Sequence, residues 1–296
     1  MTCIDELRAH FPILGRKIYG KSLVYFDNAA TSQRPQSVID KWDDSTRTQN
    51  ANIHRGIHCL SEEATTQFEA ARDAVREFIN AGHREEIIFT SGATASINLV
   101  AFSFGEAFVG EGDEVIVSEA EHHSDIVPWQ MMCQRKKAQL KVLHVDDKGL
   151  LQVSELETLI TSKTKIIAVA HISNVLGIVN PIAKIVSLAH SHGVPVLVDG
   201  AQGIVHETVD VQALDCDFYA FSGHKIYAAP GTGVLYGKRK WLDAMPPYMG
   251  GGEMIATVRF SGTTYAPIPE KFEAGTQNIA GIPTFVPAIR MAENMR

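Results

Sequence analysis

Two patterns of apolar and polar positions, one typical of strands and one of helices, alternate through the middle of the chain. Seven short runs are rich in β-branched and aromatic residues, and most of them lack a polar face, which is typical of buried strands. They are EIIFT (86–90), EVIVSEA (114–120), LKVLHV (140–145), KIIAVAHI (165–172), VPVLVDG (194–200), DFYAFSG (217–223) and TGVLYG (232–237). Strands that are apolar on both faces predict a sheet that is covered on both sides.

Segments with helical spacing separate these runs, at residues 96–108, 125–137, 153–161 and 181–193. In the last of them, Ile182, Ile185, Val186 and Ala189 fall on one face, and Gly193 stands where a helix C-cap is favoured. Strands that alternate with helices predict an α/β fold with a largely parallel sheet.

The first 85 residues carry a different pattern. A short amphipathic opening and a turn-rich stretch around FDNAATSQRP precede a longer helix, for which Ser61 and the following glutamates are the expected start signal and Asn-Ala-Gly (80–82) the stop signal. At the other end, FVPAIRMAENMR begins a helix with no element after it. We therefore expect the chain to be cut short.

Composition narrows the class of protein. The 296 residues are 45% hydrophobic and 21% charged, as in a folded soluble protein, and 27 Lys+Arg against 34 Asp+Glu disfavour a nucleic-acid partner. The charged amino terminus and the shortness of the apolar runs predict a cytoplasmic protein without a membrane segment. The four cysteines form no CxxC pair, so we expect reduced thiols rather than disulfides; they are Cys3, Cys59, Cys133 and Cys216.

Four polar clusters follow predicted strands: SGATAS (91–96), EHHSD (121–125), DGAQG (199–203) and SGHK (222–225). Ligands of doubly wound α/β folds bind at the carboxyl ends of the strands. In the first cluster, free N–H groups at a helix start and the Thr94 hydroxyl suit a phosphate. An ordinary N-cap followed by small packing residues is the alternative interpretation of the same residues. Neither a P-loop nor a Gly-x-Gly-x-x-Gly pattern is present, which disfavours nucleotides.

Acidic and aromatic side chains of the next clusters have two interpretations each. Asp199 either caps the following helix or holds a proton on a heterocyclic nitrogen, with Gln202 in reach of the same ligand. His122 and His123 lack the HExxH spacing of a metal site, so we expect no metal. An imidazole also stacks on other flat rings, and a satisfied loop histidine is the alternative for both.

Lys225 is the most informative residue. Desolvating an ammonium group is costly, and the same desolvation turns the amine into a nucleophile that can form a Schiff base. Ser222 and His224 add two donors suited to a phosphate, whereas a lysine that reaches solvent from a loop is the alternative. Taken together, the four clusters predict pyridoxal 5′-phosphate as the cofactor, because this ligand combines an aldehyde, a ring nitrogen and a phosphate.

The chain resembles the class V aminotransferase family and, within it, the SUF-type (group II) cysteine desulfurases, also described as selenocysteine lyase-like. The matching stretches occur in family order across most of the sequence: YFDNAATSQRP (25–35), NIHRGIH (52–58), AEHHSDIVPWQ (120–130), HISNVLG (171–177), VLVDGAQ (196–202), FSGHKIYAAPGTGVLYG (221–237), GGGEMI (250–255) and KFEAGTQN (271–278). The resemblance implies the large domain of a fold type I (aspartate aminotransferase-like) PLP-dependent transferase, with a mostly parallel seven-stranded sheet and the C-terminal small domain largely missing. It divides the chain into a segment 1–20 that packs with the small domain, a cofactor-binding domain 21–280, and a connection 281–296.

The resemblance also assigns roles to single residues. Lys225 would attach the cofactor and transfer protons, and His122 would stack on its ring and help to move protons. Asp199 would pair with the ring nitrogen and Gln202 with the ring oxygen. Thr94, Ser222 and His224 would bind the phosphate, and Thr276 would reach the phosphate from the second subunit of a homodimer. Asn174 and Arg55 would lie on the substrate side.

The implied reaction converts L-cysteine to L-alanine and passes sulfur, as a persulfide, to a SUF-type acceptor protein for iron–sulfur cluster assembly. The family's persulfide-forming cysteine and substrate-binding arginine lie in a C-terminal domain that these residues do not match, and Cys59 is interpreted as structural. The alternatives are another class V enzyme, such as a selenocysteine lyase, aminotransferase or epimerase, or an inactive cofactor-binding fragment. Loss of the C-terminal part predicts uncovered apolar surface and poor solubility.

Overall fold

The computed structural model describes residues 4–295, which form two compact units. We call residues 4–78, 222–232 and 276–295 the helical unit, and residues 79–221 and 233–275 the sheet unit. The domain boundaries that the resemblance implies, at residues 20 and 280, stay a prediction. Across residues 4–295, no helix is both long enough and apolar enough to span a bilayer.

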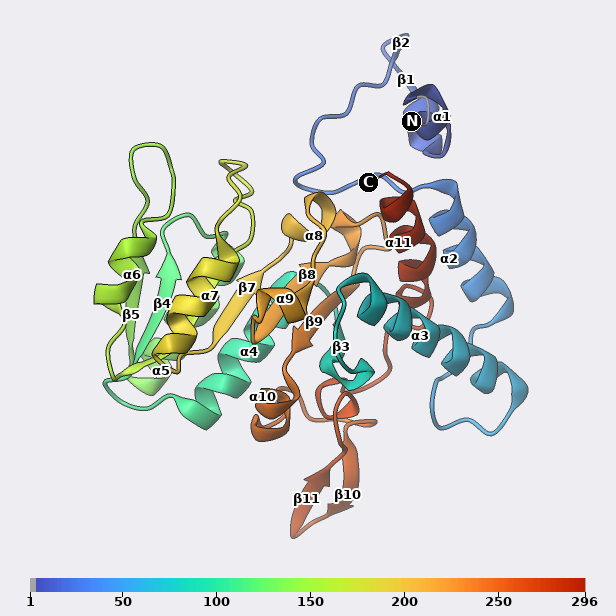
Figure 1. Ribbon diagram of the computed structural model, residues 1–296. Helices are drawn as coiled ribbons and strands as arrows, with labels where there is room; N and C mark the ends of the chain where they lie inside the picture. Colours follow the sequence, from blue (N-terminus) through green and yellow to red (C-terminus); the bar gives the residue numbers. More distant parts are fainter. Residues whose placement is uncertain (1–3, 296) are drawn as a thin grey trace. The chain divides into compact units, whose positions relative to one another are not determined.

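A seven-stranded sheet is the centre of the sheet unit (Figure 1). Its strands are β3 (Ile87–Thr90), β4 (Glu114–Ser118), β5 (Gln139–Leu143), β6 (Thr164–Ala170), β7 (Val196–Asp199), β8 (Phe218–Ser222) and β9 (Gly233–Gly237), in the order β3-β9-β8-β7-β6-β4-β5. β4 pairs in parallel with β5 and β6, β6 with β7, and β7 with β8, whereas β3 is antiparallel to β9. The predicted mostly parallel sheet is confirmed, and each of the seven predicted runs overlaps one strand.

The first four helices of the sheet unit overlap the four predicted segments, whereas the last three, each of six residues or fewer, were not predicted. In chain order, the helices are α4 (Ala93–Phe108), α5 (Val127–Lys136), α6 (Val153–Leu159), α7 (Ile182–Ser191), α8 (Gly203–His206), α9 (Val211–Leu214) and α10 (Arg239–Ala244). Gly193 lies just beyond α7 with a φ of +72° and donates its N–H to the carbonyl of His190. The helix therefore ends as its sequence predicted, because glycine adopts this left-handed conformation without a steric cost.

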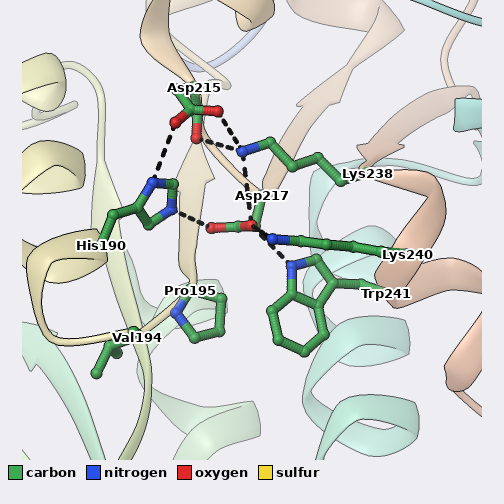
Figure 2. Close-up of a pocket in the computed structure, with 9 residues that line it drawn as sticks. His190, Val194, Pro195, Asp215, Asp217, Lys238, Lys240 and Trp241 are labelled. Atoms are coloured by element: carbon green, nitrogen blue, oxygen red, sulfur yellow. Dashed lines mark hydrogen bonds and ion pairs between the residues drawn. The ribbon is translucent and has the colours of Figure 1, made fainter.

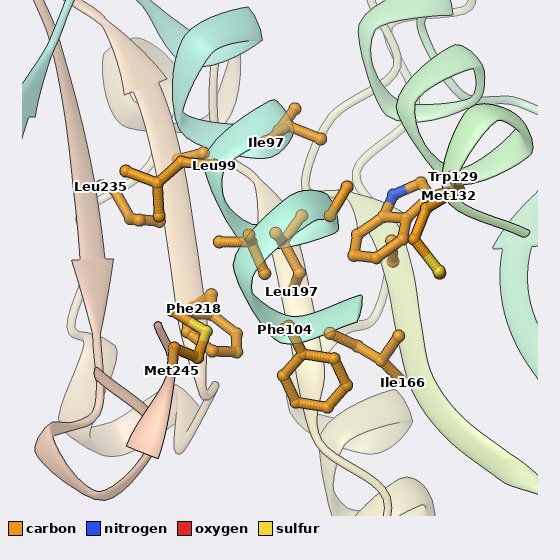
Figure 3. Close-up of a cluster of buried hydrophobic side chains, with 14 of the residues drawn as sticks. Ile97, Leu99, Phe104, Trp129, Met132, Ile166, Leu197, Phe218, Leu235 and Met245 are labelled. Carbon is orange, nitrogen blue, oxygen red and sulfur yellow. The ribbon is translucent and has the colours of Figure 1, made fainter. Parts of the chain in front are cut away.

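The core of the sheet unit lies where α4 and α5 cover one face of the sheet (Figure 3). Phe104 and Trp129 from these helices pack in one cluster with Ile166, Leu197 and Phe218 from β6, β7 and β8. The alternate residues of β6 and β7 point to the other face and are just as buried, so both faces are covered. Replacing a core residue such as Leu197 by Ala costs about 2–5 kcal/mol in such a setting.

Two parts of the sheet unit differ from the sequence expectation. β5 stands at the edge of the sheet and only Leu143 in it is buried, since an edge strand packs against fewer neighbours. An exposed hairpin of β10 (Ile255–Arg259) and β11 (Gly262–Tyr265) was not predicted, because its residues are mostly polar. Three 3-10 helices complete the unit: η2 (Arg84–Glu86), η3 (His123–Asp125) and η5 (Glu270–Phe272).

Three helices form the centre of the helical unit, with α11 (Phe285–Asn294) packed on both α2 (Gln36–Thr48) and α3 (Cys59–Phe78) (Figure 1). Phe68 of α3 and Phe285 of α11 are fully buried there. The other elements are α1 (Ile4–Ala9), η1 (Pro12–Gly15), β1 (Lys17–Ile18), β2 (Lys21–Ser22), η4 (Gly223–Lys225) and η6 (Ile282–Thr284).

The start of α3 corrects the sequence prediction. The helix begins at Cys59, two residues before the predicted Ser61. His58 Nδ1 accepts the N–H of Ser61 at 3.3 Å, and the Ser61 hydroxyl donates to the carbonyl of Asn52 at 2.7 Å instead of capping the helix. The cap is therefore a histidine, which the usual Ser/Thr/Asp/Asn start signal does not include.

Candidate active site

Each unit carries five of the predicted site residues. The sheet unit holds Thr94, His122, Asn174, Asp199 and Gln202, and the helical unit holds Arg55, Ser222, His224, Lys225 and Thr276. Ser222 ends β8 and is the first residue of its segment in the helical unit.

Asp199 lies at the carboxyl end of β7 and is only 5% exposed. Its Oδ1 accepts the N–H of Ala201 at 2.9 Å, and Gln202, also buried, lies just before α8. A buried carboxylate and a buried amide thus stand in one tight loop at the ligand-binding end of a parallel strand, as the sequence predicted.

Close packing fixes this loop. A Cβ on Gly200 would lie 2.0 Å from a ring carbon of Tyr219, and a Cβ on Gly203 would lie 2.5 Å from Nδ1 of His171. Only glycine fits at either place. His171 Nδ1 and the Tyr219 hydroxyl are 2.9 Å apart, and burial lowers the pKa of His171, which favours its neutral ring. This neutral pair was missed by the sequence reasoning, and it supports the loop that carries Asp199.

Thr94 is the second residue of α4 and is exposed. The cap residue before the helix, Gly92, has a φ of +153°, and a Cβ on Gly233 would lie 2.3 Å from the Gly92 Cα. Thr90 Oγ1 and Ser96 Oγ, 2.8 Å apart, hold the first turn to the strand before it. A well-anchored start of a 16-residue helix with a hydroxyl beside it has the donors that a phosphate needs.

His122 is exposed on the loop after β4. Its Nδ1 accepts the N–H of Ser124 at 3.1 Å, which fixes the orientation of the ring. The His123 ring lies 5.9 Å away at an interplanar angle of 45°, so the two rings are not stacked on each other. Within residues 4–295, no group of three or more His, Cys, Asp or Glu residues is placed to hold a metal ion.

Asn174 is exposed in the loop between β6 and α7. Ser173 donates its N–H to the carbonyl of Ile178 at 3.0 Å and accepts the N–H of Gly177 at 2.9 Å, which closes the loop into a tight turn. The loop thus presents the Asn174 side chain to solvent, and its substrate-side role stays a prediction.

Two buried acids next to His122 were missed by the sequence reasoning. Glu121 Oε1 accepts hydrogen bonds from the Ser118 hydroxyl and, at 2.9 Å, from the Ala170 N–H, and Asp125 Oδ1 accepts from Trp129 Nε1 at 2.8 Å. Burial raises the pKa of Glu121 to about 8 and that of Asp125 well above its ordinary value. A signal was present, since both acids flank the histidines of EHHSD beside the apolar residues IVPW.

In the helical unit, residues 223–227 are held by the segment before α2. The carbonyl of His224 accepts from both the N–H and, at 2.9 Å, the hydroxyl of Ser32, whose Oγ in turn accepts the N–H of Tyr227 at 3.0 Å. A Cβ on Gly223 would lie 2.2 Å from Thr232 Oγ1, so the glycine of SGHK is required by packing. The half-buried Lys225 therefore follows a firmly fixed backbone.

His224 has a polar but partly buried environment. Its Nδ1 lies 3.1 Å from Thr31 Oγ1. Burial lowers the pKa of His224, and the charges of Lys225 and Arg34 lower it further. A neutral imidazole beside two cations suits the binding of an anion such as a phosphate.

Arg55 and Thr276 are both exposed. Arg55 follows His54, which has a φ of +67°, and donates its N–H to the carbonyl of Ile53 at 2.9 Å in the loop before α3. Thr276 begins the last segment of the helical unit. Their roles toward substrate and toward a partner subunit stay predictions.

The cysteines described by the structure are free thiols. Burial raises the pKa of Cys133 to about 11 and that of Cys216 further still, whereas exposed Cys59 has its pKa raised by a hydrogen bond to Glu63. None of these three is poised as a thiolate, the form that reacts. Cys3 lies outside the described residues.

Comparisons with known proteins identify the family of this chain. The model of the aminotransferase class-V family matches residues 24–296. A cysteine desulfurase of Enterobacter sp. (strain 638) is 51% identical over 280 residues, covering 94% of this chain and 69% of the relative, and one of Shigella sonnei is 52% identical over the same length.

Solved structures give the same result. The cysteine desulfurase CsdA of Escherichia coli superposes with a TM-score of 0.89 at 41% identity, covering 98% of this chain and 71% of that one. The apo cysteine desulfurase of Thermococcus onnurineus gives a TM-score of 0.93 at 37% identity, covering 100% and 72%. The predicted α/β fold is that of these PLP-dependent fold type I enzymes. The chain belongs to the class V aminotransferase family, and its homologues there are cysteine desulfurases.

Proposed function

We propose that this chain is a SUF-type cysteine desulfurase that binds pyridoxal 5′-phosphate and converts L-cysteine to L-alanine. The observation that carries the proposal is the 51% identity, over 94% of the chain, to a relative named cysteine desulfurase. Class V aminotransferases use this cofactor. When bound, it supplies an electron sink for the negative charge that develops at the substrate α-carbon.

The residues present fit this cofactor in chemical type. Asp199 is a buried carboxylate suited to a protonated ring nitrogen, and buried Gln202 suits the ring oxygen. The flat ring of His122 is held in one orientation by Ser124 and suits stacking. Lys225 would supply the amine that holds the cofactor through its aldehyde group. The phosphate donors in this proposal are Thr94, Ser222 and His224 and, from a second subunit, Thr276.

Lys225 and His122 move protons in the proposed reaction. Once displaced by the substrate amine, the Lys225 amine would take the α-proton of the bound amino acid, and the His122 imidazole would exchange a proton with the substrate near its sulfur. Arg55 and Asn174 contact the substrate from exposed loops.

The sulfur step needs a second thiol. That thiol's sulfur bonds to Sγ of cysteine while the Cβ–Sγ bond breaks and leaves its electron pair on carbon, and a proton then goes to Cβ. L-cysteine and the thiol thus yield L-alanine and a persulfide, from which sulfur passes to a SUF-type acceptor for iron–sulfur assembly. The raised pKa values of Cys59, Cys133 and Cys216 disfavour all three as that thiol.

The test is reconstitution of the chain with pyridoxal phosphate, followed by visible absorption and by assay of alanine and sulfide from L-cysteine. We expect a visible band of the lysine-bound cofactor that Lys225→Ala abolishes, and alanine formation that falls by about 10²–10⁴ in that variant. The matched control is Lys148→Ala, in an exposed loop, which should keep both.

Each adverse outcome has a distinct meaning. A wild-type chain that stays colourless contradicts cofactor binding. A coloured chain that forms no alanine, even with added thiol, contradicts the desulfurase and leaves a cofactor-binding form without turnover, whereas turnover of selenocysteine but not of cysteine identifies a lyase instead.

We further propose a cytoplasmic homodimer. The support is the EAGTQN motif around Thr276 together with the absence of disulfides among the described cysteines. Sedimentation equilibrium of the wild type should give twice the chain mass of 32.4 kDa, and a monomer at micromolar concentration contradicts the dimer.

A further inference from the structure

Glu121 and Asp125 form a buried acid pair whose hydrogen-bond donors are all neutral. Glu121 is 8% exposed and Asp125 is fully buried. One oxygen of each acid accepts from neutral groups, namely the Ser118 hydroxyl, the Ala170 N–H and the Trp129 indole. A hydrogen bond from a neutral donor stabilises an ionised carboxylate less than a hydrogen bond from a cationic donor does.

The second oxygen of each acid is the unusual feature. Glu121 Oε2 and Asp125 Oδ2 are buried and, among residues 4–295, have no hydrogen-bond donor. Two ionised carboxylates would leave both oxygens unpaired inside the protein, which is costly. The two side chains interact with each other, so a single proton on Asp125 would give both of these oxygens a partner.

No counter-ion reaches the pair from the elements packed around it. In α4 the one charged residue, Glu106, pairs with Arg135 and Lys136, which are also the charged residues of α5. Glu114 of β4 pairs with Lys141. The remaining cation of these elements is Lys165 of β6, and it pairs with Asp113.

The other ionisable neighbours do not supply one either. β7 contributes Asp199, whose charge acts on both acids. On the adjoining loop, Glu119 accepts the N–H of Val145, and the His122 ring accepts from Ser124. His123 is exposed, and within residues 4–295 no hydrogen bond or ion pair brings a cationic side chain to Glu121 or Asp125.

We propose that Asp125 is protonated in the folded protein, donates this proton to Glu121, and thereby makes the acid pair a positioning element for Asp199. A proton-sharing pair removes negative charge from beside Asp199, and like charges there would disfavour its ionised form. The pair also ties the loop that carries His122 to the end of β6 through Ala170. Its value to catalysis rests on the proposed function, in which Asp199 faces the cofactor ring.

The proposal sets the direction of a pH dependence. An unfolded aspartic acid has a pKa near 4, and burial raises the pKa of Asp125 in the folded protein well above that value. Between these values the native state holds more protons than the unfolded state. Each such proton makes the unfolding equilibrium constant rise about tenfold per pH unit as pH increases.

The test uses the protein without cofactor, so that it is independent of the proposed function. Urea unfolding is measured from pH 5 to 8 for the wild type and Asp125→Asn, whose amide keeps a donor for Glu121 and an acceptor for Trp129. We expect the ratio of the two unfolding constants, wild type over variant, to rise by up to about tenfold per pH unit. A constant ratio across this range overturns the proposal.

Infrared difference spectra give a second readout. The wild type should show the C=O band of a protonated carboxyl group at pH 7, and this band should be lost in Asp125→Asn. Asp217→Asn removes an equally buried acid that has cationic partners, and it should keep the band. If Asp125→Asn does not fold, Glu121→Gln serves instead, because its amide donates to Asp125. A wild type without the band at pH 7 overturns the proposal.

Discussion

The sheet unit buries carboxyl groups at both ends of its parallel strands, and the two ends treat them in opposite ways. Asp217 stands before β8 and lines a pocket of about 280 Å³. Figure 2 shows it among His190, Lys238, Lys240 and Trp241. Its Oδ2 lies 2.7 Å from His190 Nε2, and its Oδ1 accepts from Trp241 Nε1 at 2.7 Å. At the other end, the buried acids Glu121 and Asp125 accept hydrogen bonds from a hydroxyl, a backbone N–H and an indole, all of them neutral groups.

The difference is one of charge balance. Lys240 and Lys238 lie 3.4 and 3.7 Å from Asp217, so this carboxylate has counter-ions and acts as a structural anchor. Among the described residues, Glu121 and Asp125 accept hydrogen bonds from neutral donors and form no ion pair, and burial raises the pKa of both. An uncompensated acid cluster is costly to the fold and is typical of a functional site. The comparison teaches that burial alone does not distinguish an anchor from a site, whereas the partners do.

The largest effect on stability should come from Asp217→Ala. It removes the acceptor of the Val196 N–H as well as that of Trp241 and leaves the cations without their buried partner. We expect a loss of about 3–5 kcal/mol in the free energy of unfolding, measured by urea denaturation at pH 7. Asp215→Ala, at a mostly exposed carboxylate of the same pocket, is the control and should cost far less. Equal losses would refute the role of Asp217 as an anchor.

Asp199→Asn should separate function from stability. The amide keeps an acceptor for the Ala201 N–H, so the fold should persist, but it lacks the charge that pairs with a protonated ring nitrogen. We expect alanine formation from L-cysteine to fall by about 10²–10³, equivalent to about 2.7–4 kcal/mol. Asp147→Asn, in an exposed loop, should change nothing. Full activity of Asp199→Asn would remove Asp199 from the proposed site.

Truncation of the acid pair should have an intermediate effect on stability. Asp125→Ala leaves the Trp129 N–H without its acceptor and removes the donor to Glu121, so we expect a loss of about 1–3 kcal/mol. Asp125→Asn should be nearly neutral at pH 5, because it replaces a protonated acid by an amide of the same shape. If both variants lose stability equally at pH 5, shape rather than hydrogen bonding dominates at this position.

The smallest expected effect is on the pH dependence of stability, which should differ between the two ends of the parallel strands. A hydrogen bond from Lys238 lowers the pKa of Asp215, so its stabilisation is present above the unfolded pKa of about 4 and is lost as pH falls through the folded value. Because the Asp215 side chain is 62% exposed, solvent screening limits this contribution to about 1 kcal/mol or less. Acid titration of the unfolding free energy from pH 5 to 2, wild type against Asp215→Asn, measures it.

The acid pair should show the opposite sign, with stability lost as pH rises from 5 to 8. A stability that rises across this range in the wild type relative to Asp125→Asn would contradict the difference between the two ends.

The sequence by itself determined most of the fold. Hydrophobic periodicity located all seven strands of the sheet and the helices α4 to α7, because burial on both faces leaves a continuous apolar run and one-sided burial leaves a helical stripe. The left-handed Gly193 after α7 was also predicted, since that conformation is a local property. The order of the strands in the sheet was not predicted. A periodic pattern indicates which face of a strand is buried, but it does not identify the neighbouring strand or helix.

For the candidate site, the sequence determined which chemistry stands at the strand ends, and tertiary structure decided its environment. SGHK and DGAQG could be interpreted as cofactor-binding motifs from their residue types and their positions after predicted strands. The clamp of Ser32 on the carbonyl of His224 joins residues 192 apart, and no local pattern encodes it. Asp125 and Asp217 are both aspartates beside apolar runs, and only the packing of distant strands and helices surrounds one with neutral donors and the other with cations.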